Sequence, residues 1–302
     1  MINPQNIIAH LQEDAQFLPE DVLIILGPTA SGKTKLAVEL AKHLNAEIIS
    51  ADSRQVYRHM NIGTGKDLVE YQDVPYHLID ILDPGEKYNI DLFLKDFEDS
   101  YSDIIKRGKR VIVCGGTGFY IQNLLQPLPY TQVPIDKDLR EKLELRDKAE
   151  LYEMLQELPI PTGFNVDFSS RKRIIRAIEI CYYLAKYPDF KFTKNASYRY
   201  KILGLNPPVE LRRERISKRL QQRIDEGMIA EVEELVKGGV TFDELEYYGL
   251  EYKYISYYLK REMTYEAFFQ KLETEIHRYA KRQMTYFRKM EKDGIMIEWV
   301  SK

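Results

Sequence analysis

One short segment restricts the fold of this chain more than any other feature of its sequence. A five-residue apolar run at 22–26 is followed by an eight-residue turn, made of Gly27, Pro28, Thr29, Ala30, Ser31, Gly32, Lys33 and Thr34. The turn satisfies the pattern G-x-x-x-x-G-K-[ST], in which glycines let backbone N–H groups face a phosphate and the next helix adds a positive dipole. Lys33 supplies a full charge, and the Thr34 hydroxyl can bind Mg²⁺. The segment predicts a phosphate-binding loop (P-loop) but leaves open which phosphate compound binds.

The residues around this loop predict an α/β fold with a P-loop NTPase-like parallel sheet. Short apolar runs that end in glycine or polar residues are typical of buried parallel strands, and apolar residues at helical spacing lie between them. The pattern predicts helices at 33–44 and 90–107, and strands at 22–26, 47–50, 111–114 and 201–205. Strands that alternate with helices favour a doubly wound sheet.

The sequence changes in character after residue 122. Three prolines within 126–134 are typical of a linker, and helical patterns follow at 137–157, 170–186, 207–237 and 264–292. We therefore expect three parts: an N-terminal extension with a short helix at 1–20, a core with helices at its C-terminal end formed by 21–122 and 198–302, and a helical insertion at 123–197.

Composition excludes several classes of protein. The chain has 302 residues with 44% hydrophobic residues, as in soluble globular proteins. Its apolar runs of about five residues are far shorter than the ~20 that a membrane span needs, and its first residues lack a secretory signal pattern. Two cysteines, Cys114 and Cys181, form no CxxC pair, which argues against a disulfide framework or a cysteine zinc site. These features predict a cytoplasmic protein with no membrane segment.

Basic residues are concentrated in two stretches of a chain whose formal net charge is −3. Residues 171–223 contain 15 Lys and Arg against 4 Asp and Glu, and residues 271–292 contain 7 against 3. Such clusters are typical of proteins that bind a polyanion such as nucleic acid, although a solvated helix face has the same pattern.

Asp52 is the acidic residue whose position in the sequence suggests a role beside the P-loop. An ATPase, GTPase or small-molecule kinase usually has an apolar strand that ends in Asp and holds Mg²⁺, yet the strand at 111–114 is followed by Gly115-Gly116. Asp52 instead follows the strand at 47–50, and at the carboxyl end of a parallel strand it would face the ligand crevice. From position alone it is a metal ligand, a general base or a cap for the next turn.

The motifs together resemble those of the tRNA dimethylallyltransferase family, also called tRNA isopentenyltransferase. The resemblance extends over about 22–290, and it rests on GPTASGKT at 27–34, DSRQVY at 52–57, GGTG at 115–118, RIIRAIE at 173–179, GMIAEV at 227–232 and RYAKRQMTYF at 278–287. The family transfers a dimethylallyl group from dimethylallyl diphosphate to N6 of an adenosine beside the tRNA anticodon, usually position 37. Its P-loop binds a prenyl diphosphate, which explains the absence of the kinase-type Asp.

The resemblance implies a role for each part of the predicted site. Lys33, Thr34 and the amides of the P-loop would bind the diphosphate and Mg²⁺, with Thr34 as the metal ligand. Asp52 would be the general base for the adenine amine. Arg219 would bind the diphosphate as the family arginine eight residues before Gly227, with Arg215 as the alternate.

The resemblance also implies a set of tRNA-binding residues, some of which lie in the insertion. The target base would be extruded from the anticodon loop of the tRNA. The implied contacts are Asp52, Ser53, Arg54, Gln55, Thr117, Arg140, Lys172, Arg173, Arg176, Arg278, Lys281 and Arg282. The family also implies a monomer. The sequence departs from the family pattern at Gly65–Asp67 and at Gly249–Tyr254, which puts the loop contacts in question.

Two other functions remain possible at this point. An adenylate isopentenyltransferase shares the P-loop and the base, but it would not need the insertion or the basic C-terminal helix. A P-loop small-molecule kinase would need a nucleotide-base pocket, which we do not identify in the sequence.

Overall fold

The computed structural model describes residues 4–14, 17–192 and 198–300. The chain forms two compact units, one made of residues 1–125 and 197–302 and the other of residues 126–196. Helix α4 (Gly118–Leu125) continues past residue 123, so the second unit begins three residues after the predicted start of the insertion.

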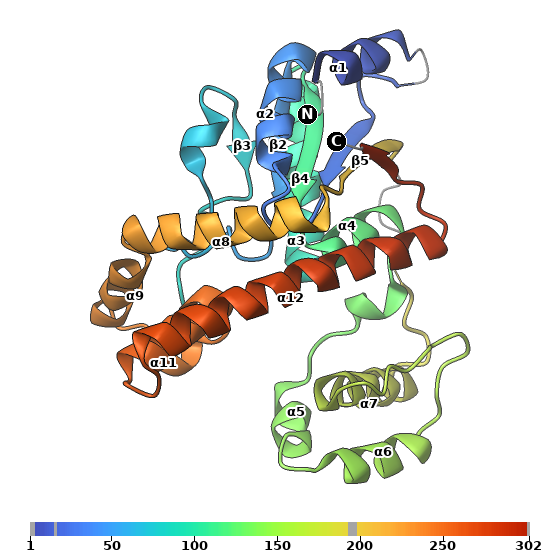
Figure 1. Cartoon of the computed structure of the whole chain (residues 1–302). Helices are drawn as coiled ribbons and strands as arrows, with labels where there is room; N and C mark the ends of the chain where they lie inside the picture. The colour runs from blue at the N-terminus through green and yellow to red at the C-terminus, as the bar shows by residue number, and fades with distance from the viewer. Residues whose placement is uncertain (1–3, 15–16, 193–197, 301–302) are drawn as a thin grey trace. The chain divides into compact units, whose positions relative to one another are not determined.

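The first unit is built on a six-stranded sheet (Figure 1). Its strand order is β3-β2-β4-β1-β5-β6, and every pairing is parallel. The strands are β1 (Val22–Leu26), β2 (Ala46–Ala51), β3 (Tyr76–His77), β4 (Arg110–Gly115), β5 (Tyr200–Leu205) and β6 (Glu298–Val300). The predicted parallel α/β fold is confirmed, as are the four predicted strands; the two edge strands β3 and β6 were not predicted.

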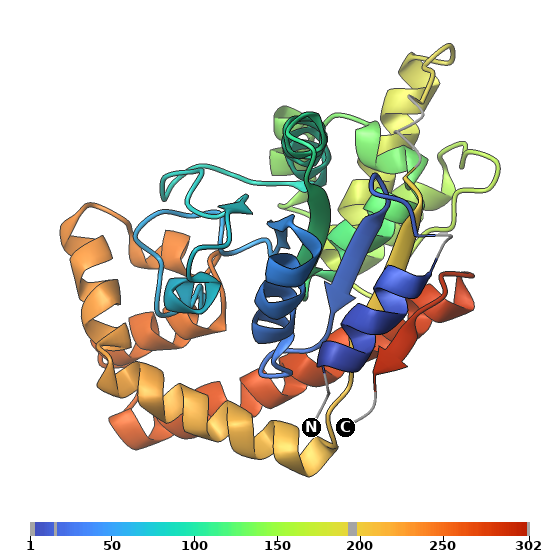
Figure 2. The same ribbon diagram turned by 90° about the horizontal axis from the view of Figure 1, so that it is seen from above.

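Helices cover both faces of this sheet, because alternate residues of each strand point to opposite faces. In β1, Leu23 and Ile25 pack toward helices α1 (Pro4–Glu13) and α2 (Lys33–Leu44), which lie beside each other (Figure 2). Ile24 and Leu26 pack on the other face, whose core includes α3 (Ile90–Lys106) and α4. The short helix expected in the N-terminal extension is present as α1.

The C-terminal helices are α8 (Val209–Asp225), α9 (Met228–Lys237), α10 (Phe242–Leu245), α11 (Leu250–Leu259) and α12 (Tyr265–Lys292). The prediction of one helix at 207–237 is wrong, because Gly227 has φ +99 and separates α8 from α9. The sequence pattern also missed α10 and α11. Helices α8 and α12 contact each other, and α12 runs below α8 in the view of Figure 1.

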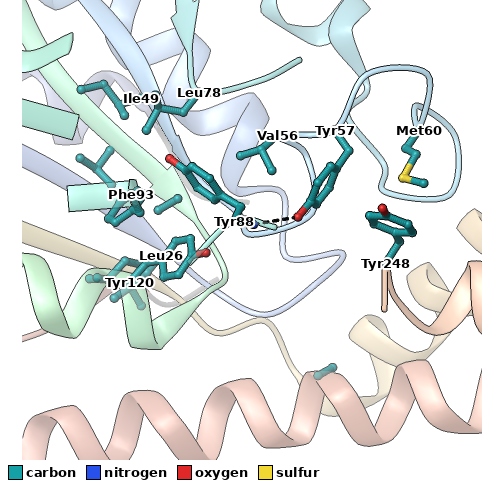
Figure 3. Close-up of a cluster of buried hydrophobic side chains, with 14 of the residues drawn as sticks. Leu26, Ile49, Val56, Tyr57, Met60, Leu78, Tyr88, Phe93, Tyr120 and Tyr248 are labelled. Carbon is teal, nitrogen blue, oxygen red and sulfur yellow. Dashed lines mark hydrogen bonds between the residues drawn. The ribbon is translucent and has the colours of Figure 1, made fainter. Parts of the chain in front are cut away.

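A cluster of buried tyrosines joins this helical part to the sheet (Figure 3). Tyr57 packs edge-on against Tyr248, with ring centroids 4.8 Å apart, and its hydroxyl accepts a 3.2 Å hydrogen bond from the backbone N–H of Tyr88. The contact fixes the turn between α10 and α11 beside the segment that follows β2. The segment after β2, near residue 52, and the start of α11, near residue 250, therefore lie close together.

The second unit contains η2 (Pro129–Gln132), α5 (Lys137–Leu143), α6 (Lys148–Gln156) and α7 (Arg171–Lys186). The prediction of one helix at 137–157 is wrong, because Asp147 starts α6 with a capping box that it forms with Glu150. Leu151, Ile174 and Ile178 are fully buried in the core of this unit. The helical character predicted for this part of the chain is confirmed.

Candidate active site

The P-loop connects β1 directly to α2. Gly27 lies so close to β5 that a Cβ on it would be 2.9 Å from the Leu205 carbonyl oxygen. Ala30 and Gly32 have left-handed backbones with φ 58 and 86, and α2 begins at Lys33. A loop with this backbone, directly before a helix N-terminus, is typical of sites that bind an anion through backbone N–H groups. The Ser31 hydroxyl is buried and has no hydrogen-bond partner among the described residues.

A cavity of about 430 Å³ lies beside the P-loop in the first unit. Two sequence-predicted groups meet on its wall: Lys33 and Thr34 from α2, and Asp52 after β2. Burial lowers the pKa of Lys33; Cys114 and Asp52 oppose this effect, and the positive charges of Arg219 and Arg223 add to it. Two arginine side chains thus line the cavity close to the buried Lys33.

Asp52 stands at the end of β2, as its place in the sequence predicted. Its Oδ1 accepts a 2.9 Å hydrogen bond from the Arg54 backbone N–H, so it caps the turn that follows the strand. The same carboxylate lines the cavity with Lys33 and Thr34. Capping and facing the cavity, which the sequence offered as alternatives, occur together.

The other residues of the DSRQ segment are held by neighbours from distant parts of the chain. The Ser53 N–H donates to Thr117 Oγ1 at 3.2 Å, and Gln55 Nε2 donates to the Gly65 carbonyl at 3.0 Å. The Arg54 guanidinium lies 4.7 Å from the centre of the Tyr247 ring. All four DSRQ residues line the cavity.

The loop at 61–67 contributes Gly63, Thr64 and Gly65 to the cavity wall. Glu231 of α9 accepts hydrogen bonds from the backbone N–H groups of Asn61, Ile62 and Gly63 at 2.8, 2.7 and 3.0 Å. Buried Lys66 donates to the Tyr57 carbonyl at 2.6 Å and also pairs with Asp80. These contacts fix the loop against α9 and against the segments that follow β2 and β3.

Arg219 lies on α8, where the family pattern implied a diphosphate ligand. It lines the cavity with Lys33, and its guanidinium pairs with Asp67. Arg223, one turn later, lines the same cavity. Arg215, the alternate, instead lines a second cavity of about 1000 Å³, which Ser31 and Gly32 of the P-loop also line. Arg219 and Arg223 contribute to both cavities.

The sequence-predicted tRNA contacts do not all lie at this cavity. Arg282 lines it, whereas Arg278 and Lys281 are exposed on α12, and Arg278 pairs with Glu275 at 2.6 Å. Thr117 is not among the lining residues but accepts the hydrogen bond from Ser53, and the other four, Arg140, Lys172, Arg173 and Arg176, belong to the second unit. The basic stretch 171–223 is consequently divided between two units rather than forming one helix face.

Several of the second unit's arginines have structural partners. Arg140 and Arg176 both contact Oε2 of the buried Glu179, at 2.5 and 3.4 Å. Arg173 pairs with Asp167 at 2.5 Å, and Lys172 is exposed. Ion pairs therefore account for part of the positive charge that the sequence attributed to a polyanion.

Sequence reasoning missed residues that organise the site. Gln283 of α12 accepts from the Thr29 N–H at 2.9 Å and donates to the Gly116 carbonyl at 3.0 Å, so it links the P-loop to the end of β4. Glu231, Arg223 and Glu251 were also missed. Arg223 had a local signal in its i+4 spacing from Arg219, whereas Gln283 and Glu231 act on loops more than 160 residues away in the sequence.

Neither a protein metal cluster nor a membrane helix is found. Within residues 4–14, 17–192 and 198–300, no three His, Cys, Asp or Glu side chains gather as a metal site. Over the same ranges, none of the helices combines the length and the apolar character needed to cross a membrane. An ion at this site would thus depend on the few oxygen donors of the cavity wall and on its ligand.

Comparison with known proteins agrees with this architecture. The family model described as IPP transferase matches residues 55–290, and the model described as isopentenyl transferase matches residues 20–73. The tRNA dimethylallyltransferase 2 of Bacteroides fragilis is 48% identical over 286 residues, which cover 93% of this chain and 92% of that protein. The tRNA dimethylallyltransferase 1 of Geotalea uraniireducens is 44% identical over 280 residues, with the same coverage.

Solved structures give the same result. The tRNA isopentenylpyrophosphate transferase of Bacillus halodurans matches with a TM-score of 0.68 and 32% identity, covering 93% of this chain and 90% of that one. A eukaryotic dimethylallyltransferase acting on tRNA matches with a TM-score of 0.74 and 25% identity, covering 93% and 74%. The fold, the P-loop and the matches over most of the sequence lead to one conclusion: this chain belongs to the IPP transferase family, whose curated relatives are tRNA dimethylallyltransferases.

Proposed function

We propose that this protein transfers the dimethylallyl group of dimethylallyl diphosphate to N6 of adenosine 37, next to the tRNA anticodon. The product is N6-isopentenyladenosine in tRNA. The observation that carries the proposal is the shared cavity, in which Lys33, Thr34 and Arg219 face Asp52. Cations suited to a diphosphate and a carboxylate suited to a proton thus line the same space of about 430 Å³.

The proposed reaction is a single displacement at C1 of the prenyl group. The C1–O bond to the diphosphate breaks, and its electron pair stays on the diphosphate. A bond forms between C1 and the adenine N6, and one N6 proton moves to the Asp52 carboxylate. Lys33, Arg219 and the P-loop amides stabilise the charge that grows on the leaving group.

The donor chemistry of the cavity fits a Mg²⁺ ion bound together with the diphosphate. Mg²⁺ prefers oxygen ligands and keeps several waters, so one hydroxyl and the diphosphate oxygens suffice. Thr34 would hold the ion, and Asp52 is a second oxygen donor on the same wall. The bound ion would neutralise part of the leaving-group charge.

The tRNA anticodon stem-loop is the proposed partner. The residues that we propose as its contacts are Asp52, Ser53, Arg54, Gln55, Thr117, Arg140, Lys172, Arg173, Arg176, Arg278, Lys281 and Arg282. The helical insertion, predicted at 123–197, supplies four of them. We propose that the protein acts as a monomer in the cytoplasm, where its tRNA substrate is found.

The proposal is tested by an assay with two acceptors. Purified protein is incubated with Mg²⁺, dimethylallyl diphosphate and bulk bacterial tRNA that lacks this modification, with AMP in a parallel reaction. Digestion and mass spectrometry then detect adenosine that carries one added C5H8 group. We expect the product in tRNA and none on AMP.

Other outcomes would contradict the proposal in distinct ways. Product on AMP alone would identify an adenylate isopentenyltransferase. Absence of product on both acceptors, with ATP consumed instead, would identify a P-loop kinase.

A further inference from the structure

Arg223 occupies a position in the site that the family pattern does not account for. It lies one helical turn after Arg219 on α8 and faces the same cavity as Lys33 and Thr34. It also lines the second cavity, together with Gly32 and Lys33 of the P-loop. Arg223 and Arg219 therefore both line the two cavities beside the phosphate-binding turn.

Arg223 is buried, and burial together with Arg219 lowers its pKa, while Glu251 and Asp67 oppose this effect. Its side chain is only 11% exposed, and its one ion pair among the described residues is a 3.9 Å contact with Asp67. A charge-assisted hydrogen bond is about 2.7–2.9 Å long, so this contact is too long to be one. The buried Nε has no hydrogen-bond partner in the described part of the chain. Burying a charge without full pairing is costly, which favours an anion as the missing partner.

The surroundings hold this guanidinium in place. A Cβ on Gly65 would be 1.6 Å from its Nη2, so only glycine lets the 61–67 loop approach so closely. Asp67, on the same loop, already pairs with Arg219. Asp67 is thus shared by two guanidinium groups, and Glu251 on the same cavity wall offsets part of the charge of Arg223.

We propose that Arg223 is a second diphosphate-binding arginine, acting beside Arg219 in the reaction proposed above. The inference rests on that proposed function. A diphosphate offers several negative oxygens, more than Lys33 and Arg219 occupy, and a guanidinium can bind two of them with its planar fork. Binding would supply the partner that Arg223 lacks and would stabilise the departing diphosphate.

The test measures binding of inorganic pyrophosphate with Mg²⁺ to the full chain by calorimetry. Arg223→Met removes the charge and keeps the length of the side chain. We expect about 10- to 100-fold weaker binding, the range for a lost charge-assisted hydrogen bond, and partial recovery in Arg223→Lys. The KM for dimethylallyl diphosphate should rise, while the KM for tRNA stays unchanged. Arg213→Met, at an exposed position of the same helix, is the matched control.

Two further variants separate the possible failures. Lys33→Met should abolish pyrophosphate binding if the P-loop holds the diphosphate; unchanged binding in this variant would refute the proposed function itself. Wild-type affinity in Arg223→Met, with Lys33→Met impaired, would refute only the role of Arg223.

Asp67→Asn tests whether Arg223 acts only through its acidic neighbour. We expect this variant to bind pyrophosphate at least as tightly as the wild type, because a competing negative charge is lost. If it instead weakened binding as much as Arg223→Met does, Arg223 would have a structural role and the inference would be wrong.

Discussion

Asp52 is the residue at which the proposed chemistry is tested most directly. Its Oδ1 caps the turn through the Arg54 N–H, and its carboxylate lines the cavity. Asp52→Ala should lower turnover by about 10²- to 10⁴-fold, the usual range for a lost general base, while tRNA binding is retained. Single-turnover kinetics and a filter-binding assay measure the two effects.

A second variant separates the loss of the general base from the loss of the cap on the turn. Asp52→Asn keeps a side-chain oxygen that can cap the turn but cannot take a proton at neutral pH. We expect it to be as inactive as Asp52→Ala. Full turnover in either variant would show that Asp52 is not the base.

At the scale of secondary-structure elements, α9 supports the 61–67 loop through one side chain. Glu231 accepts three backbone hydrogen bonds and a fourth, at 2.8 Å, from the Tyr252 hydroxyl. Glu231→Gln should lower the free energy of unfolding by about 1–3 kcal/mol, because a neutral amide cannot accept the charge-assisted bonds of all four donors. Thermal melting measures the loss.

The same helix supplies the control for this prediction. Glu234 pairs with Lys237 at 2.6 Å, but its side chain is 71% exposed, and exposed pairs contribute little. Glu234→Gln should leave the melting temperature unchanged. Equal effects of the two substitutions would contradict the role assigned to Glu231.

Helix α12 supports the P-loop in a comparable way. Gln283 joins Thr29 to Gly116, so Gln283→Leu removes one hydrogen bond from each of these two backbone groups. We expect the KM for dimethylallyl diphosphate to rise about tenfold, the effect of losing roughly 1.4 kcal/mol of binding. Gln270→Leu, at an exposed position of the same helix, should not change it. A defect confined to tRNA binding would contradict this role.

At the scale of the whole molecule, one buried carboxylate should govern stability in acid. Glu47 of β2 is fully buried, which raises its pKa, but hydrogen bonds from Arg107, Lys109 and His77 outweigh burial and lower the pKa to about 2. A lowered pKa means that Glu47 stabilises the fold above about pH 4.5. This contribution, roughly 3 kcal/mol for a shift of this size, is lost as the pH falls toward 2.

Glu47→Gln should therefore be less stable than the wild type at pH 7, and the difference should shrink between pH 4.5 and 2. Urea unfolding across this range measures it. Glu98→Gln, an exposed change on α3, should follow the wild type. A difference that does not depend on pH would show that packing, not charge, explains the effect.

The sequence by itself determined the local features of this protein. Apolar runs and helical spacing predicted the four inner strands and the helices α2, α3 and α12 to within two residues at either end. Such elements can be predicted because the alternation of buried and exposed positions appears as a pattern of apolar and polar residues within a short window of sequence. The P-loop and the place of Asp52 after β2 followed from the same local patterns. The interruptions at Gly227 and Asp147 were missed, since a helical pattern can continue across a glycine or a cap.

Only the tertiary structure decided which residues share the site. The two segments that depart from the family pattern, near Asp67 and near Glu251, both reach the arginines of α8; Asp67 pairs with Arg219, and Glu251 lines the same cavity. Glu231 and Gln283 act on loops more than 160 residues away in sequence. Such contacts depend on how helices pack over the sheet, and residues far apart in the chain carry no shared local period that would reveal them.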